Sequence, residues 1–372
     1  MVNGRYSGTV IIDVHCHYTL SAKRVCPNIE RFSFEPAQEA AGAGYDTCIA
    51  PRAARRWAWS VVRRMLRVDS RLPIGEALDG ELHAAAERHL LNSTGPIERF
   101  VLLAFDWYHD DSGRQPPLPQ REGIEGSDIY TSNSLIRDLC RRHPQRYLFG
   151  ASVHPYREHA VQCIDEVFSA GACLLKWLPL HQNINAADPR SRAVLRRCGE
   201  LGLPVLAHYG EEFTLATQRR EYIHVRQFLD ALRDLRRDGH MPPAIVAHVS
   251  TPVMPWGDHS STRMLIDALT GEFAQAPLYA DISALTTLGK IPYLKSLARR
   301  QDLHHKLLFG SDWPVPPLSP MLRLLVGRDY SAVRGEPSWP QRVALLCQRM
   351  GFNEIVFQRA AEILPNVHFF SR

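Results

Sequence analysis

Four histidines and one aspartate carry the chemistry that the sequence suggests. His15 and His17 stand two apart at the end of an apolar run near the start of the chain. Side chains two apart on an extended chain face the same side, about 6–7 Å apart along the chain. Two imidazoles at that spacing can bind one metal ion, because Zn–N bonds measure about 2.0–2.1 Å. Cys16 would point the other way, so we do not expect it to be a ligand.

Three further ligand candidates, His208, His248 and Asp312, end other apolar runs. A single histidine at a strand end usually makes an ordinary hydrogen bond, and Asp312 alone could cap a turn. The indication therefore comes from the joint pattern, in which each run is apolar until its last residues and then presents a ligand. Three histidines and a carboxylate suit zinc, while iron, manganese and cobalt accept similar ligands.

The runs that carry these residues recur along the chain with helical patterns between them. Eight of them are expected to be strands: residues 9–15, 100–106, 148–154, 172–177, 204–208, 244–248, 278–283 and 306–312. Helical spacing is found at residues 132–142, 157–170, 191–201, 225–237 and 263–269. Strands this apolar are typical of parallel sheets buried on both faces. The alternation predicts an α/β fold, a (β/α)8 TIM barrel, which places reactive side chains at the C-terminal ends of its strands.

An open, doubly wound sheet is the alternative architecture. It requires a glycine-rich phosphate loop after the first strand, where His15 and His17 stand instead. A ninth candidate strand at residues 45–50 is assigned to an insertion, because Pro51 and a cluster of arginines follow it. We predict a single domain over residues 1–372, with residues 18–99 inserted after strand one and lying over the barrel mouth. That segment is far longer than an ordinary connection.

Composition excludes several other classes of protein. A hydrophobic content of 45% and a net charge of +5 describe an ordinary globular chain without the basic concentration of a nucleic-acid binder. No apolar run approaches the ~20 residues of a membrane span. Eight cysteines without metal-finger spacing, and no apolar leader, lead us to expect a cytoplasmic protein. The basic amphipathic pattern at residues 55–68 is interpreted as packing within the domain or in a homodimer, rather than on a membrane.

The sequence resembles the amidohydrolase superfamily, specifically its amidohydrolase-2 branch of metal-dependent TIM-barrel hydrolases. The resemblance runs from about residue 9 to residue 364. The segments that carry it are Asp13-Val14-His15-Cys16-His17, Lys176-Trp177-Leu178-Pro179, Ala207-His208-Tyr209-Gly210, Ala247-His248-Val249-Ser250 and Gly310-Ser311-Asp312-Trp313-Pro314. The branch includes hydrolases, lactonases, hydratases and nonoxidative decarboxylases, so it implies a metal and a barrel more firmly than one reaction.

The resemblance also implies roles for single residues. His15, His17, His208 and Asp312 would hold a divalent metal, with Zn2+ as the first choice. With one ion, His248 would be an acid–base group or a carbonyl polariser. With two ions, a carboxylated Lys176 would bridge them, and His208 and His248 would hold the second ion. The alternative is a bare Lys176 that pairs with a carboxylate or with an anionic substrate.

We expect a hydrolase that cleaves a C–N or C–O bond, in an amide, lactone or ester, of a small organic substrate through a metal-activated water. Asp312 would take a proton from the water and pass it to the leaving group, while His248 would stabilise the oxyanion or act as the acid. Candidate substrate contacts are Trp177, Tyr209, His154 and Arg52. The same site could serve a nonoxidative decarboxylase of a small carboxylic acid. A scaffold without catalysis is disfavoured, because both acid–base candidates are present.

Overall fold

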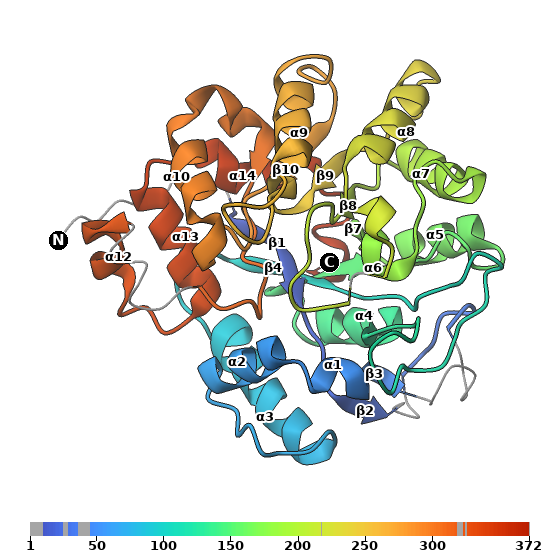
Figure 1. Ribbon diagram of the computed structural model, residues 1–372, viewed down its shortest axis with the longest axis horizontal. Helices are drawn as coiled ribbons and strands as arrows, with labels where there is room; N and C mark the ends of the chain where they lie inside the picture. Colours follow the sequence, from blue (N-terminus) through green and yellow to red (C-terminus); the bar gives the residue numbers. More distant parts are fainter. Residues whose placement is uncertain are drawn as a thin grey trace.

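Eight parallel strands form the centre of the molecule in this computed structural model (Figure 1). The structure describes residues 10–24, 29–35, 45–216, 218–317, 323 and 326–371. In the order of their pairing, the strands are β1 (Ile12–His17), β4 (Arg99–Leu103), β6 (Tyr147–Ala151), β7 (Leu174–Trp177), β8 (Val205–Ala207), β9 (Ala244–Val246), β10 (Leu278–Asp281) and β11 (Leu307–Leu308). Each overlaps one of the eight predicted runs; position 9, where the first run begins, lies outside the described residues.

The last strand returns to the first. Cys16 forms a parallel bridge with Trp313, and the His17 N–H donates to the Trp313 carbonyl over 2.7 Å. Closer to the start of β1, the Val14 N–H donates to the Phe309 carbonyl over 3.2 Å. These bonds close the sheet, so the TIM barrel predicted from the sequence is confirmed.

The strands are apolar because both of their faces are buried. The inner face fills the barrel with aliphatic side chains, among them Ile12, Val101, Leu148, Leu174, Leu206, Ile245 and Leu308. Residues of the helix α14 (Glu354–Ile363) and of the segment after it, including Ala360 and Leu364, belong to the same apolar cluster. The outer face packs under the surrounding helices. The interior is thus a packed core, and the polar side chains of the site lie toward the C-terminal strand ends.

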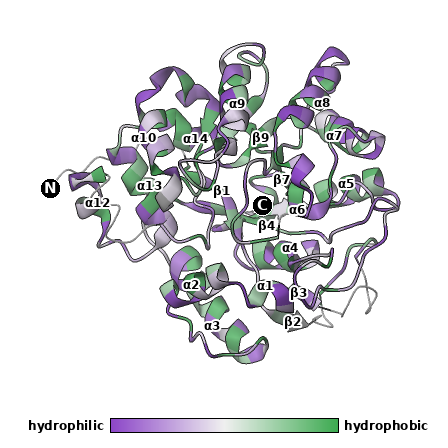
Figure 2. Cartoon of the chain, in the orientation of Figure 1, coloured by the Kyte–Doolittle hydropathy of each residue, from purple (hydrophilic) through white to green (hydrophobic). Residues whose placement is uncertain are grey.

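Amphipathic helices cover the sheet. They are α4 (Asn133–Arg142), α5 (Ala160–Ser169), α7 (Pro189–Leu201), α8 (Arg226–Arg237), α9 (Ser260–Thr270), α10 (Ile291–Arg299) and α13 (Trp339–Arg349), with the shorter α6 (Pro179–Gln182) and α12 (Arg328–Val333). The five predicted helical patterns correspond to α4, α5, α7, α8 and α9. Ser132, Asp188 and Ser338 cap α4, α7 and α13 by accepting a backbone N–H in the first turn. Figure 2 shows the outer helices hydrophilic toward solvent and more hydrophobic toward the strands.

The chain between β1 and β4 forms its own small elements. These are β2 (Ala22–Arg24), β3 (Tyr45–Ile49), α1 (Pro51–Ala54), α2 (Trp57–Met65), α3 (Glu76–Ala86) and the π-helical turn η1 (Glu87–Leu91). β3 pairs antiparallel with β2 and with β5 (Ile129–Thr131), so the ninth candidate strand lies outside the barrel, as predicted. The limits of a single domain, and the placement of residues 18–99 over the mouth, stay predictions.

Two further observations concern the cysteines and the helices. Seven cysteines are buried and free, and the eighth, Cys26, lies outside the described residues. Within the described part of the chain, every helix is too short or too polar to cross a membrane.

Candidate metal centre

An irregularity in β1 turns His15 and His17 toward the site. Asp13 pairs with Phe100 of β4, and the next paired residue of β1 is Cys16, opposite Leu102. Two residues of β1 therefore oppose a single residue of β4, which is a β-bulge. A bulge reverses the alternation of side chains beyond it, and bulges commonly re-aim side chains at functional sites. As a result Cys16 packs in the outer core cluster, as the sequence led us to expect.

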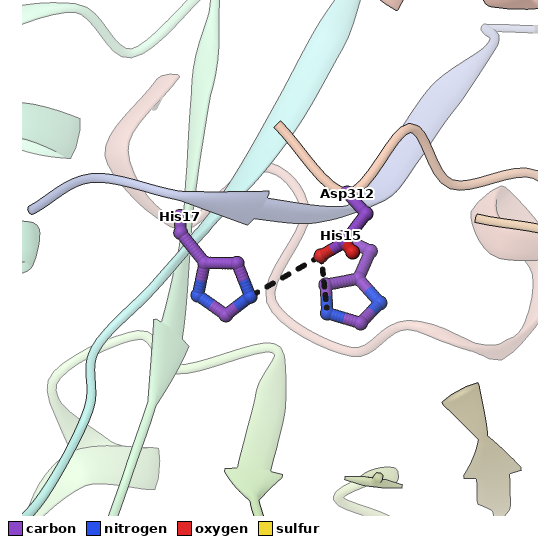
Figure 3. Close-up of side chains that lie close together, drawn as sticks. All are labelled: His15, His17 and Asp312. Atoms are coloured by element: carbon purple, nitrogen blue, oxygen red, sulfur yellow. Dashed lines mark ion pairs between the residues drawn. The ribbon is translucent and has the colours of Figure 1, made fainter. Parts of the chain in front are cut away.

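Asp312 reaches the two histidines from the other end of the chain (Figure 3). Its Oδ1 lies 3.3 Å from His15 Nε2 and 3.4 Å from His17 Nε2. The segment after β11 can approach this closely because residue 310 is glycine: a Cβ there would lie 2.9 Å from the Cβ of His15. Asp312 itself has a φ of +61°, an uncommon conformation for a residue with a side chain and one found at functional sites.

A carboxylate behind His15 sets the protonation of its ring. His15 Nδ1 lies 2.9 Å from Asp281 Oδ2 at the end of β10. Because an ionised carboxylate can only accept, Nδ1 carries the proton and Nε2 presents its lone pair to the site. This lone pair faces the Asp312 oxygen, so two acceptors point at the same space. A positive charge beside them, either the Lys176 ammonium or a bound metal ion, would relieve their repulsion.

Sequence reasoning missed Asp281, although a signal was present. It ends an apolar strand in the same way as the histidines do, and residues 278–283 were recognised as a strand. Asp281 contacts the proposed metal ligand His15 and is not itself one of the proposed ligands. Such a carboxylate leaves no metal-ligand spacing in the sequence, so only its position at a strand end could have indicated it.

His248 lies beside His15 and faces the second oxygen of Asp312. The two rings stack with centroids 5.0 Å apart, and His248 Nε2 lies 3.7 Å from Asp312 Oδ2. His248 Nδ1 is 3.0 Å from the carbonyl oxygen of Ser283, which can only accept, so this ring also presents a lone pair at Nε2. The backbone here is unusual, because residues 248–250 all have φ near +52°.

His208 stands at the edge of this group rather than inside it. Its ring packs against His248 with centroids 4.6 Å apart, and its Nδ1 lies 3.6 Å from Glu212 Oε2. The compact ligand groups among the described residues are His15–His17–Asp312 and His15–His248–Asp281, so His208 belongs to neither.

Lys176 enters the same space from β7. Its Nζ lies 2.9 Å from His15 Nε2 and donates to that lone pair. Burial lowers the pKa of Lys176 to about 8, although the nearby Asp312 and Asp281 oppose the shift. The ammonium therefore stays the major form at neutral pH, but the neutral amine is far more accessible than in an exposed lysine.

Burial also decides the charge of the other site groups. It lowers the pKa values of His15, His208 and His248 below the ordinary histidine value, so these rings are neutral at pH 7. Burial raises the pKa of the Asp312 carboxyl, and the neighbouring His17 and Lys176 partly offset this rise. Neutral imidazoles are the form that binds metal.

The residues present fit a divalent cation. His208 Nε2 is buried and has no hydrogen-bond partner among the described residues, while His17 faces the site through Nε2, 3.4 Å from Asp312 Oδ1. The lone pairs of His15, the Asp312 carboxylate and these two rings form a nitrogen-and-oxygen donor set, which suits zinc and related transition metals.

The four residues predicted to contact the substrate instead contact other residues of the protein. Trp177 Nε1 donates to the Val153 carbonyl over 2.9 Å, and the Tyr209 ring stacks on Phe228. His154 Nε2 lies 2.7 Å from the Gln182 carbonyl, while Arg52 Nε donates to Asp128 over 2.6 Å. All four side chains are buried. Contact of these residues with a substrate stays a prediction.

The fold and this cluster define a TIM barrel with a candidate metal centre at the C-terminal ends of its strands. A protein-family model described as amidohydrolase matches residues 12–337. The chain therefore belongs to the amidohydrolase family, as the resemblance in its sequence indicated. No curated protein matches it.

Solved structures with a similar fold include enzymes of two reaction classes. An uncharacterized TIM-barrel protein from Bordetella bronchiseptica is 15% identical, with a TM-score of 0.52, over 94% of this chain and 99% of that chain. The probable 2-pyrone-4,6-dicarboxylic acid hydrolase of Acinetobacter baumannii is 11% identical, with a TM-score of 0.48, over 97% and 99%. The 5-carboxyvanillate decarboxylase of Sphingomonas paucimobilis is 13% identical, with a TM-score of 0.45, over 94% and 99%. At 15% identity, the likeness to the Bordetella bronchiseptica protein shows the fold alone.

Proposed function

We propose that this protein is a metal-dependent hydrolase that cleaves a C–N or C–O bond, in an amide, lactone or ester, of a small organic substrate through a metal-activated water. The observation that carries the proposal is the convergence of His15 Nε2 and His17 Nε2 on one oxygen of Asp312, within 3.3 and 3.4 Å. Two imidazoles and a carboxylate that converge this closely are typical of a site that holds a cation.

His15, His17, His208 and Asp312 are the proposed ligands. His208 would complete the set through its unpartnered Nε2 after a change in side-chain position. When bound, a divalent cation supplies Lewis-acid chemistry, activating water at neutral pH and polarising a carbonyl group.

The chain's own residues would handle the protons. Asp312 has one oxygen toward His15 and His17 and the other toward His248, so it can accept a proton from the attacking water and release it to the leaving group. Burial raises the pKa of its carboxyl, which favours proton uptake. The unprotonated Nε2 of His248 makes this ring a proton acceptor or a ligand of a second ion.

Lys176 is the proposed bridge of a two-metal site. A lone pair on Nζ would attack carbon dioxide, forming an N–C bond and releasing one proton, and would leave a carbamate anion. A pKa of about 8 supports this step, because the neutral amine is the reactive form. Carboxylation would also replace the ammonium that now occupies the lone pair of His15.

A nonoxidative decarboxylase is the second candidate, and the position of the Lys176 ammonium supports it. An ammonium 2.9 Å from His15 Nε2 places a positive charge beside the proposed ligands, where it could hold a substrate carboxylate. The same residues would then form a one-metal site without a bridge.

Metal analysis and substrate screening test the proposal together. Protein purified without chelator is expected to contain one or two zinc ions per chain, and His15→Ala should lose them. A panel of lactones, amides and aromatic acids, followed with a carbon dioxide assay, separates hydrolysis from decarboxylation. Asp312→Asn should nearly abolish turnover while it partly retains metal. Full activity of Asp312→Asn, or of protein stripped of metal, would overturn the proposal.

A further inference from the structure

The hydroxyl of Ser283 lies between two histidine rings of the metal centre. Ser283 follows β10 and is fully buried. Its Oγ lies 3.0 Å from His15 Nδ1 and 2.8 Å from His248 Nδ1. The two rings are nearly parallel, with an angle of 17° between their planes. One hydroxyl therefore contacts both rings at Nδ1, whereas their Nε2 atoms face Asp312.

Asp281 fixes the direction of the hydroxyl proton. The Ser283 hydroxyl donates to Asp281 Oδ1, which also accepts the backbone N–H groups of His248 and Ser283. A hydroxyl has one proton to donate and two lone pairs that accept. Because an ionised carboxylate only accepts, the proton points at Asp281 and both lone pairs remain for the rings. His15 Nδ1 and His248 Nδ1 must then both carry protons, and these three bonds use the whole capacity of the hydroxyl.

Each ring also has an acceptor of its own. His15 Nδ1 lies 2.9 Å from Asp281 Oδ2, and His248 Nδ1 lies 3.0 Å from the Ser283 carbonyl oxygen. Asp281 Oδ1 lies 3.8 Å from His248 Nδ1, which is beyond hydrogen-bond distance. Within the described part of the chain, the Ser283 hydroxyl is thus the side-chain group that hydrogen-bonds both rings at Nδ1.

Close packing keeps Ser283 in this position. A Cβ at Gly310 would lie 3.1 Å from the Cβ of Ser283 and 2.9 Å from the Cβ of His15. The segment that leads to Asp312 therefore packs directly against the residue that contacts the rings. A side chain held by packing and by several hydrogen bonds can set the orientation of its neighbours precisely.

We propose that Ser283 is a positioning residue of the metal centre, and that its hydroxyl orients His15 and His248 together so that both Nε2 lone pairs face Asp312. The inference rests on the proposed function, in which His15 is a metal ligand and His248 an acid–base group. A group hydrogen-bonded to the far nitrogen of a metal-binding histidine fixes its tautomer and the orientation of its ring. Because the two rings share one acceptor, loss of the hydroxyl should disturb both of them. A hydroxyl that only closed the turn at Asp281 would disturb neither.

Histidine-ring NMR of the full-length protein, with zinc and without it, tests the proposal. Wild type should show a proton on Nδ1 of both His15 and His248, with the signals assigned through His15→Gln and His248→Gln. In Ser283→Ala, both Nδ1–H signals should shift upfield, because each ring loses a hydrogen bond. Zinc affinity should fall about 10-fold, the lower end of the range for a group that supports a metal ligand, since Asp281 still contacts His15. The matched control is Ser191→Ala, which removes a buried hydroxyl from α7 and should leave the signals and the zinc Kd unchanged.

Unchanged Nδ1–H signals in Ser283→Ala, or a change at His248 alone, would overturn the proposal. If that variant does not fold, the spectrum of metal-free wild type decides. A proton on Nε2 of either ring would then overturn the proposal, and protons on Nδ1 of both rings would support it.

The metal-free spectra do not depend on hydrolysis, so the two proposals can fail separately. A protein that binds no zinc but shows the Ser283-dependent signals would refute the hydrolase alone. Zinc binding and hydrolysis, with signals and zinc affinity that do not respond to Ser283→Ala, would refute the role of Ser283 alone.

Discussion

Replacing Asp281 with asparagine tests how the protein prepares His15 to bind metal. Oδ1 of Asp281 accepts the backbone N–H groups of His248 and Ser283 over 2.9 and 3.0 Å, and Oδ2 faces His15 Nδ1. In Asp281→Asn, the amide oxygen would keep the two backbone bonds, and the NH2 group would then face His15 Nδ1. Two donors cannot bond to each other, so His15 would move its proton to Nε2 and lose the lone pair that binds metal.

The expected loss of zinc affinity is about 10- to 100-fold, which corresponds to about 1.4–2.8 kcal/mol. Titration of metal-free protein against a chromophoric chelator measures it. Urea unfolding of the metal-free protein is the companion measurement, because a purely structural role of Asp281 would lower stability without a selective loss of affinity. Asp302→Asn, which alters an exposed aspartate paired with Arg300, is the matched control. Wild-type zinc affinity in Asp281→Asn would refute the tautomer argument.

Three further predictions concern packing, a buried ion pair and pH. Gly310→Ala should destabilise the fold by about 1–3 kcal/mol in urea unfolding, because the new Cβ would lie 2.9 Å from a neighbouring Cβ. Arg157→Met should cost about 3–5 kcal/mol in the same assay, because it leaves the buried Asp106 carboxylate without the guanidinium that bonds it over 2.6 and 2.5 Å. Burial lowers the pKa of His109 from 6.5 to about 4, so the unfolded chain alone binds this proton between those values. Stability should therefore fall as pH drops through that window, by up to about 1.4 kcal/mol per pH unit, and the fall should be smaller in His109→Gln.

Each of these predictions has its own control. Gly335→Ala places a Cβ with no atom within 4 Å and should be nearly neutral, so an equal loss in both glycine variants would contradict the packing argument. Arg300→Met breaks an exposed pair and should cost only about 0–1 kcal/mol. If Arg157→Met is equally mild, the ion pair is not needed for stability. An unchanged pH dependence in His109→Gln would show that His109 does not titrate on unfolding.

Much of the fold could be predicted from residue patterns alone. The strands are buried on both faces. Burial on both faces requires continuous apolar runs in the sequence, as at β4, β7 and β9. The ligand candidates were visible because barrel enzymes place reactive side chains at strand ends, which makes a histidine after an apolar run conspicuous. The strand at residues 45–50 was correctly kept out of the barrel for a similar local reason, the proline that follows it.

Other features of the site depend on contacts that no local pattern records. The bulge in β1 is a property of its pairing with β4, since an extra residue exists only relative to a partner strand. Asp281 orients His15 across 266 positions of sequence.

The amino-acid sequence by itself determined the order of strands and helices and the side chains that stand at the strand ends, because burial and periodicity act on neighbouring residues. Only the closed barrel decided which of those side chains meet and which ring nitrogens carry protons. These properties depend on distances between strands, and such distances are set only when β11 returns to β1.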